Sequence, residues 1–184
     1  MADIGGSPAP IVVVMGVSGV GKTTVARLLA ERLDVPYAEA DDFHPAANIA
    51  KMSAGIPLQD EDRWPWLHRI AAWMAERADQ GSGGVVTCSA LRRSYRDVLR
   101  AGCSEAFFLH LAGTQGLVGD RMSHRTGHFM PTSLLDSQFA ILEPLQPDER
   151  GAMLDVGPGP EQLVEAALVL LAAGRPASPS APGA

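Results

Sequence analysis

The chain has 184 residues, enough for one domain with a sizeable core, and 46% hydrophobic beside 20% charged residues is typical of soluble globular proteins. Its net charge of −6 is spread along the sequence, which argues against a nucleic-acid partner because binding to a phosphate backbone requires a basic stripe. The two cysteines, Cys88 and Cys103, exclude a disulfide framework or a paired metal set, and we interpret them as reduced thiols.

Apolar runs alternate with helical patterns along the chain. The apolar runs have the length of buried strands and lie at 11–15, 37–40, 84–88, 106–111 and 152–156. Helical spacing predicts helices at about 22–33, 48–53, about 65–78, 92–101, about 115–123, about 132–142 and 161–172. Pro65 suits the first turn of the third of these helices, and Trp66 and Trp73 recur on its buried face.

The two ends of the chain are interpreted as tails. Residues 1–9 and 174–184 are rich in Ala, Pro, Gly and Ser, so we expect both to be disordered around a single domain at 10–173. The N-terminus lacks a basic segment followed by an apolar one, which argues against a secretory signal. Ile11–Met15 is too short to cross a bilayer. We therefore expect a cytoplasmic protein with no membrane partner.

The alternation of strands and helices predicts an α/β fold with a parallel sheet and right-handed crossovers. Ligands of such sheets bind beyond the carboxyl ends of the strands. The chemically suggestive stretches of this sequence each follow a predicted strand. The sequence therefore predicts one ligand site at the carboxyl edge of the sheet.

Residues 16–23 read Gly-Val-Ser-Gly-Val-Gly-Lys-Thr and match the phosphate-loop pattern G-x-x-x-x-G-K-[ST] between a predicted strand and a predicted helix. Glycines let the backbone wrap an anion, and the helix presents its positive dipole end to it. The pattern predicts binding of ATP or GTP, with Lys22 at the β- and γ-phosphates and the Thr23 hydroxyl in the Mg²⁺ shell. The expected nucleotide contacts are Gly16, Ser18, Gly19, Val20, Gly21, Lys22, Thr23 and Thr24.

Carboxylates follow the second predicted strand. Glu39 and Asp41 alternate as strand residues do, which places them on one face near the γ-phosphate. Glu39 is the candidate for holding Mg²⁺, and Asp41 for accepting or orienting the proton of an attacking hydroxyl. Solvated loop acids or helix caps are the alternative interpretation. His44, nearby, is either a ligand contact or a surface histidine.

Further along, the sequence resembles the gluconokinase family of P-loop kinases. The likeness spans roughly residues 11–172 and is strongest in three regions. They read Asp42-Phe43-His44-Pro45 with Asn48, Lys51-Met52, Gly55, Pro57-Leu58, Asp60, Asp62-Arg63 and Pro65-Trp66-Leu67; then Cys88-Ser89-Ala90-Leu91, Tyr95-Arg96-Asp97 and Leu99-Arg100; then Gly127-His128-Phe129-Met130 and Gln138-Phe139.

The resemblance implies a definite reaction and fold. The reaction is transfer of the ATP γ-phosphate to the 6-hydroxyl of D-gluconate, giving 6-phospho-D-gluconate and ADP. The fold is a nucleotide-kinase-like P-loop core with a five-stranded parallel sheet of order 2-3-1-4-5, flanked by helices, and a mobile lid at about 121–135. Members of the family are commonly homodimers. The sequence pattern itself shows no interface.

Gluconate carries a carboxylate and several hydroxyls, so its pocket needs cations and hydrogen-bonding side chains. The candidate cations are Lys51, Arg63, Arg92, Arg96, His44 and His128, and the candidate hydrogen-bonding groups are Asp41 and Gln138. Arg92 stands where the family usually has lysine, which leaves open which cation holds the carboxylate. Arg92 and Arg96 could equally belong to a solvated helix face, as we expect for Arg93 and Arg100.

The predicted lid supplies further candidates. Arg121 and Arg125 flank its turn, and the resemblance implies that lid arginines neutralise the transferring phosphoryl group or stack on adenine. We assign Arg125 to the first role and Arg121 to the second. His128 is expected to touch nucleotide or substrate, with a surface role as the alternative. Lid closure would exclude water from the reaction.

Other functions remain open at this stage. A kinase for another small hydroxy acid, such as shikimate, would use the same core. A GTPase switch would normally carry Asn-Lys-x-Asp, which this sequence lacks. A nucleotide-binding module without turnover is the third possibility. Selectivity among aldonates and the exact role of Asp41 are also left open.

Overall fold

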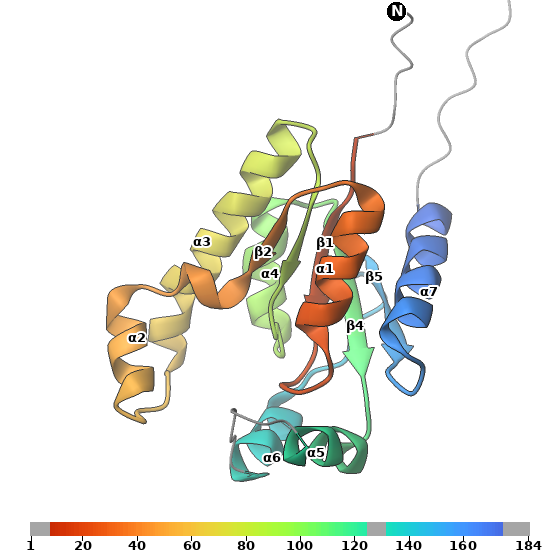
Figure 1. Cartoon of the computed structure of the whole chain (residues 1–184). Coiled ribbons are helices and arrows are strands. Elements are labelled where there is room, and N and C mark those ends of the chain that lie inside the picture. The colour runs from red at the N-terminus through yellow and green to blue at the C-terminus, as the bar shows by residue number, and fades with distance from the viewer. Residues whose placement is uncertain (1–7, 125–131, 175–184) are drawn as a thin grey trace, which may run out of the picture.

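The computed structural model describes residues 8–124 and 132–174, and its centre is a five-stranded parallel sheet of order β2-β3-β1-β4-β5 (Figure 1). Every neighbouring pair of strands runs parallel. The expected fold class and strand order are therefore confirmed. The strands are β1 (Ile11–Met15), β2 (Tyr37–Glu39), β3 (Gly84–Thr87), β4 (Phe107–Ala112) and β5 (Gly151–Asp155).

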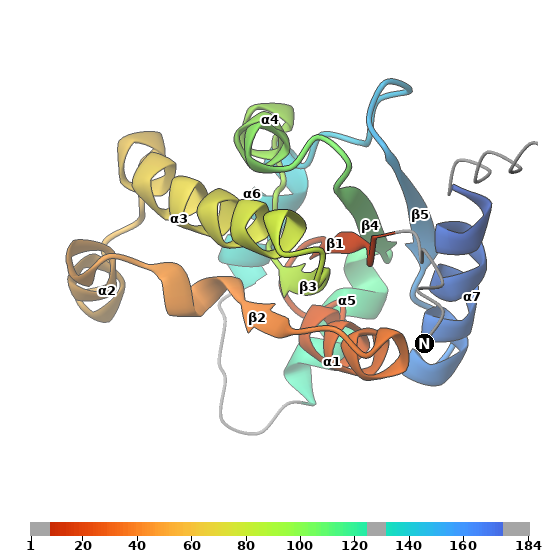
Figure 2. The same cartoon turned by 90° about the horizontal axis from the view of Figure 1, so that it is seen from above.

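Helices cover both faces of the sheet, as Figure 2 shows from above. They are α1 (Lys22–Leu33), α2 (Ala46–Ser53), α3 (Asp60–Asp79), α4 (Arg93–Gly102), α5 (Gln115–Ser123), α6 (Thr132–Ile141) and α7 (Pro160–Ala173), and a short 3₁₀ helix, η1, spans Ala40–Phe43. Helices α1 and α7 lie on one face of the sheet, and α3 and α4 on the other. Helices α5 and α6 lie beyond its carboxyl edge (Figure 1). No helix among the described residues is long and apolar enough to cross a membrane.

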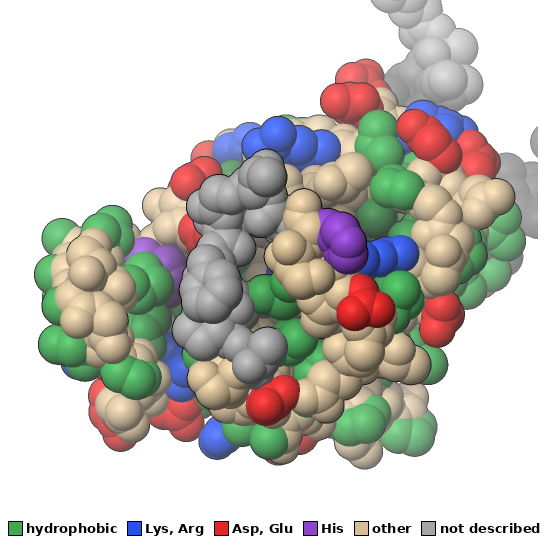
Figure 3. Space-filling view, turned by 60° about the horizontal axis from the view of Figure 1, so that its bottom comes forward, with side chains coloured by type: hydrophobic (Ala, Val, Ile, Leu, Met, Phe, Trp, Pro, Cys, Tyr) green, Lys and Arg blue, Asp and Glu red, His purple; other side chains and the backbone are tan. Residues whose placement is uncertain are grey.

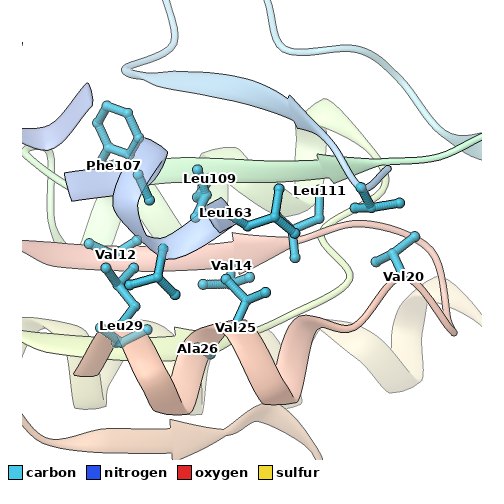
Figure 4. Close-up of a cluster of buried hydrophobic side chains, with 14 of the residues drawn as sticks. Val12, Val14, Val20, Val25, Ala26, Leu29, Phe107, Leu109, Leu111 and Leu163 are labelled. Atoms are coloured by element: carbon cyan, nitrogen blue, oxygen red, sulfur yellow. The ribbon is translucent and has the colours of Figure 1, made fainter. Parts of the chain in front are cut away.

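Strand β1 is buried along its whole length and divides the core in two. Because side chains alternate across a strand, Val12 and Val14 face the cluster beneath α1 and α7 (Figure 4), whereas Val13 and Met15 face the cluster beneath α3 and α4. Full burial of a valine or methionine side chain stabilises the fold by about 1.5–3 kcal/mol. This two-sided burial fixes the position at which β1 delivers the phosphate loop.

The third helix differs from the prediction. Helix α3 begins at Asp60, so Pro65 lies inside the helix rather than in its first turn. The helix starts earlier because Gln59 and Asp62 form a capping box, in which the Gln59 backbone N–H donates to the Asp62 carboxylate at 2.9 Å. Strand β2 also ends one residue early, since η1 begins at Ala40. The predicted tails lie largely outside the described residues, at 1–7 and 175–184.

The close packing of α4 on α3 generates a stability prediction. A Cβ atom added at Gly102 would lie 2.4 Å from the Ala71 carbonyl oxygen, which is backbone and cannot swing aside. We expect Gly102→Ala to lower the free energy of unfolding by about 1–3 kcal/mol, measured by urea denaturation. Gly119→Ala is the control, because a Cβ there meets nothing within 4 Å and should raise helix stability slightly. Equal stability of the Gly102→Ala variant and the wild type would contradict this packing.

Candidate active site

A cavity of about 740 Å³ opens at the carboxyl edge of the sheet. Figure 3 views the molecule from this end, with α2 projecting at the left. The phosphate loop, the segment after β2, the segment after β3 and helices α3, α5 and α6 all contribute to its wall. The predicted site residues that line it are Ser18, Gly19, Gly21, Lys22, Thr23, Thr24, Glu39, Asp41, His44, Arg63 and Gln138.

The phosphate loop wraps between β1 and α1 with left-handed glycines. Gly16 has φ 141°, and a Cβ there would lie 2.6 Å from the Leu111 carbonyl oxygen, so only glycine fits. The Lys22 ammonium donates to the carbonyl oxygens of Gly16 at 3.1 Å and Val17 at 3.0 Å. Val20 is buried and supports the loop from behind. The loop therefore presents backbone N–H groups and the α1 N-terminus to the cavity, an arrangement that suits phosphate.

Glu39 is held by three hydroxyl groups. Its carboxylate accepts hydrogen bonds from Thr23 at 3.2 Å, from Thr87 at 2.8 Å and from Tyr37. Burial, together with the bond to Glu39, raises the pKa of Tyr37 to about 12, so Tyr37 stays a donor. Carboxylate and hydroxyl oxygens are the ligands that Mg²⁺ prefers, so Glu39 and Thr23 fit a magnesium site.

Thr87 and Tyr37 are site residues that the sequence did not predict. The sheet register explains Thr87, because Glu39 on β2 pairs directly with Thr87 on β3. The Thr87 hydroxyl also accepts the backbone N–H of Ala40 at 3.2 Å, which fixes the end of β2. A threonine that ends a predicted strand is a signal for this role only when the strand order is known.

Asp41 and His44 stand on the acceptor side of the cavity. Asp41 lies on η1 and is exposed, and the His44 ring stacks on Trp66 with centroids 4.5 Å apart and an interplanar angle of 11°. The Trp66 indole N–H donates to the Ala40 carbonyl at 2.7 Å. Trp66 is buried as expected, and it also lines the cavity. Burial lowers the pKa of His44, and the charge of Asp41 partly offsets this. His44 is therefore a neutral hydrogen-bonding group at neutral pH.

Two predicted arginines converge on Asp60 beside the cavity. Arg63 donates to its carboxylate at 3.2 Å, and Arg92 lies 3.7 Å from the other carboxylate oxygen. The Tyr95 hydroxyl donates to Asp60 at 2.6 Å and is the main cause that holds the pKa of Asp60 below its usual range. Of these two arginines only Arg63 lines the cavity, and the Arg92 side chain is 40% exposed.

Lys51 and Arg96 do not line the cavity. Lys51 pairs with Asp62 at 2.7 Å, which ties α2 to the start of α3. The Arg96 side chain is fully buried and pairs with the equally buried Glu149 at 2.7 Å. In this arrangement neither side chain supports the predicted contact with substrate, and both hold chain segments together instead.

Helices α5 and α6 cover the phosphate loop. The Gln138 amide oxygen accepts the Ser18 N–H at 2.8 Å, and its amide nitrogen donates to the Ser18 hydroxyl at 3.2 Å. A Cβ at Gly19 would lie 2.6 Å from Met122 of α5. Arg121 donates to the Val156 carbonyl at 2.6 Å and does not line the cavity. Arg125 and His128, the other predicted lid residues, lie outside the described residues.

Comparisons with known proteins place this geometry among small-molecule kinases. The shikimate kinase family model matches residues 18–128. A gluconokinase of Gluconobacter oxydans is 53% identical over 137 residues, covering 74% of this chain and 77% of that protein. The thermosensitive gluconokinase of Escherichia coli is 46% identical over 138 residues, covering 75% of this chain and 74% of that protein. The crystal structure of a gluconokinase from Sinorhizobium meliloti superposes with a TM-score of 0.82 at 45% identity, covering 91% of this chain and 94% of that chain.

The His44 environment generates a pH prediction. Because the Asp41 carboxylate raises the pKa of His44 against the effect of burial, Asp41→Asn should lower that pKa further. Titration of the imidazole ring protons by NMR measures the shift directly. Asp42→Asn is the matched control, since Asp42 does not contribute to the pKa shift of His44 and should move it less. A His44 pKa that is unchanged or raised in Asp41→Asn would contradict the placement of Asp41.

Proposed function

The chain belongs to the gluconokinase family of P-loop kinases, and from this we propose that it transfers the γ-phosphate of ATP to the 6-hydroxyl of D-gluconate. The products are 6-phospho-D-gluconate and ADP. One observation carries the proposal: a single cavity joins the phosphate loop at Lys22 to an acceptor side that holds both Asp41 and Arg63. A carboxylate-bearing polyol matches that combination of charges.

The phosphate loop is the proposed ATP site. Its backbone N–H groups and the α1 N-terminus would hold the phosphates. The Lys22 ammonium would neutralise negative charge on the transferring phosphoryl group. The Ser18 N–H bonded by Gln138 belongs to this set, so nucleotide phosphates and Gln138 share one donor. We assign Gln138 to the phosphate side of the substrate pocket on this ground.

Thr23 and Glu39 are the proposed Mg²⁺ site. Their oxygens already lie together, at 3.2 Å, on the cavity wall beside Lys22. When bound, Mg²⁺ would neutralise phosphate charge. Thr87 and Tyr37 keep the Glu39 carboxylate oriented toward Thr23.

Asp41 is the proposed partner of the attacking hydroxyl. It lies on η1 and lines the cavity, where it can orient the 6-hydroxyl and accept its proton, although a loose transition state needs little help from a base. Arg63, backed by Arg92, is the proposed partner of the C1 carboxylate at the opposite end of the substrate. His44 would form one hydrogen bond, as donor or as acceptor, with a substrate hydroxyl that lies between Asp41 and Arg63.

The predicted lid completes the proposal. Arg125 and His128 are proposed to close on the phosphoryl group and the substrate, and Arg121 to contact adenine. Closure would exclude water, which otherwise competes as the acceptor. The homodimer, the single domain at 10–173 and the cytoplasmic location remain predictions.

The acceptor is tested by coupled ADP release with ATP and Mg²⁺ across gluconate, shikimate, glucose and nucleoside monophosphates. We expect release only with gluconate, and near-complete loss in Lys22→Ala because the phosphate loop then lacks its charge. Release with shikimate would favour the alternative suggested by the family model that matches residues 18–128. ATP binding without turnover on any acceptor would leave a nucleotide-binding module.

The metal site is tested by calorimetric titration of ADP with and without Mg²⁺. In the wild type Mg²⁺ should strengthen ADP binding, and Glu39→Gln should lose most of that gain while binding metal-free ADP normally. The matched control is Glu31→Gln, because Glu31 lies on α1 but lines a different cavity. The assignment fails if Glu39→Gln keeps the full effect of Mg²⁺ on ADP affinity.

A further inference from the structure

The segment that joins β3 to α4 carries an unusual backbone conformation beside the active site. Ala90 has φ 45°, the left-handed region that a residue with a Cβ rarely adopts, and it is 1% exposed. The preceding residues Cys88 and Ser89 line the cavity, and Arg92 follows beside Asp60. We call residues 88–92 the acceptor loop. Strain of this kind persists only where surrounding contacts over-determine it.

Backbone hydrogen bonds fasten the acceptor loop at its start. The Cys88 N–H donates to the Val14 carbonyl at 3.1 Å, and the Gly16 N–H donates to the Ser89 carbonyl at 3.2 Å. These bonds place Ser89 against the phosphate loop. They do not touch Ala90 itself, so its left-handed conformation needs another support.

Arg96 supplies that support from the first turns of α4. Its Nη1 atom donates to the carbonyl oxygens of Ala90 at 3.0 Å and Leu91 at 3.4 Å. The same guanidinium donates to both oxygens of Glu149, at 2.7 and 3.0 Å, and to the Pro144 carbonyl at 3.2 Å. Every guanidinium nitrogen is thus engaged, and the side chain is fully buried.

Glu149 and Pro144 lie in the strap at 142–149, which leads from α6 to β5. Glu149 also accepts the Gln146 N–H at 2.8 Å, and the Glu143 N–H donates to the Leu91 carbonyl at 2.8 Å. A buried ion pair with all its hydrogen bonds satisfied is rigid, because any displacement leaves charge unpaired in an apolar environment. Arg96 therefore joins the strap and the acceptor loop as one unit.

We propose that Arg96 is a positioning residue for phosphoryl transfer: through the Ala90 and Leu91 carbonyls it holds the acceptor loop so that Ser89 faces the cavity and Arg92 stands beside Arg63. This rests on the proposed function, since it assigns the acceptor loop to the gluconate side of the site. Arg96 acts on the substrate only through the loop.

The neighbouring Arg93 provides a matched control. It lies on the same helix and binds the same strap, at Asp148, with distances of 2.7 and 2.9 Å. It also pairs with Asp97 and stays partly exposed. Arg93 approaches Glu149 only at 3.9 Å, and among the described residues none of its side-chain contacts is with a carbonyl of the acceptor loop. A change at Arg93 therefore loosens the strap without releasing Ala90.

The test compares Arg96→Lys with Arg93→Lys in steady-state kinetics. A lysine at 96 can keep the charge pair with Glu149 but loses the separate Nη1 donor that reaches the two loop carbonyls. We expect the KM for gluconate to rise about tenfold, with kcat and the KM for ATP nearly unchanged, because uniform substrate binding is lost. Arg93→Lys should keep the wild-type KM for gluconate. Equal KM effects in both variants, or none in Arg96→Lys, would overturn the proposal.

Ala90→Gly supplies a rescue that a merely structural role would not show. Glycine adopts positive φ without the Cβ clash, so the loop needs less support from Arg96. The double variant Arg96→Lys/Ala90→Gly should recover most of the gluconate KM while its melting temperature stays as low as that of Arg96→Lys. A KM that remains raised in the double variant would contradict the mechanism.

Hydrogen–deuterium exchange tests without substrate whether Arg96 holds the acceptor loop. Peptides covering the acceptor loop should exchange faster in Arg96→Lys than in Arg93→Lys, and unchanged exchange would overturn the proposal. If the wild type shows no turnover with gluconate, the proposed function fails, whereas this exchange comparison still judges the role of Arg96. If Arg96→Lys does not fold, Glu149→Gln replaces it. The same rise in KM, the same rescue by Ala90→Gly and the same faster exchange are then expected, and absence of any of them counts against the proposal.

Discussion

The site depends on the parallel direction of the central strands, because it brings the ends of β1, β2 and β3 to one edge of the sheet. The phosphate loop follows β1, the acids follow β2, and the acceptor loop follows β3. The register adds the finer alignment, since Glu39 lies directly opposite Thr87. Burial of β1 on both faces then keeps the phosphate loop from shifting relative to its neighbours. Functional residues that lie far apart in the sequence therefore line one cavity.

Two polar networks turn this edge into a shaped site. On the nucleotide side, the hydroxyls of Tyr37 on β2 and Thr87 on β3 hold the Glu39 carboxylate toward Thr23. On the acceptor side, a buried guanidinium holds the backbone of a strained loop. In both networks the residue that would meet the ligand is oriented by a partner that does not. Such support is what keeps catalytic groups in place before a substrate arrives.

Much of this arrangement can be predicted from the sequence. The phosphate-loop pattern and the alternation of strands with helices predicted the approximate bounds of α1 and the fold class, since both rest on local signals. The role of Arg96 could not be predicted, because helical spacing does not show that its partner Glu149 lies 53 residues away. Helix α3 was predicted to start too late, since glutamine is an uncommon N-cap and the proline drew attention instead. Long-range partners and unusual caps are thus what the sequence alone conceals.

The central claim is that the cavity presents the terminal hydroxyl of gluconate to the γ-phosphate while its carboxylate lies at the arginines. The position of the phosphate on the product tests this most directly. Phosphorus NMR of the reaction with ATP, Mg²⁺ and gluconate should show a single phosphomonoester. Its phosphorus should couple to the two protons of one carbon, which among the carbons of gluconate only the C6 methylene carries. Coupling to one proton would place the phosphate on a secondary hydroxyl and contradict the proposed orientation. Inorganic phosphate alone would mean that water, and not the sugar acid, is the acceptor.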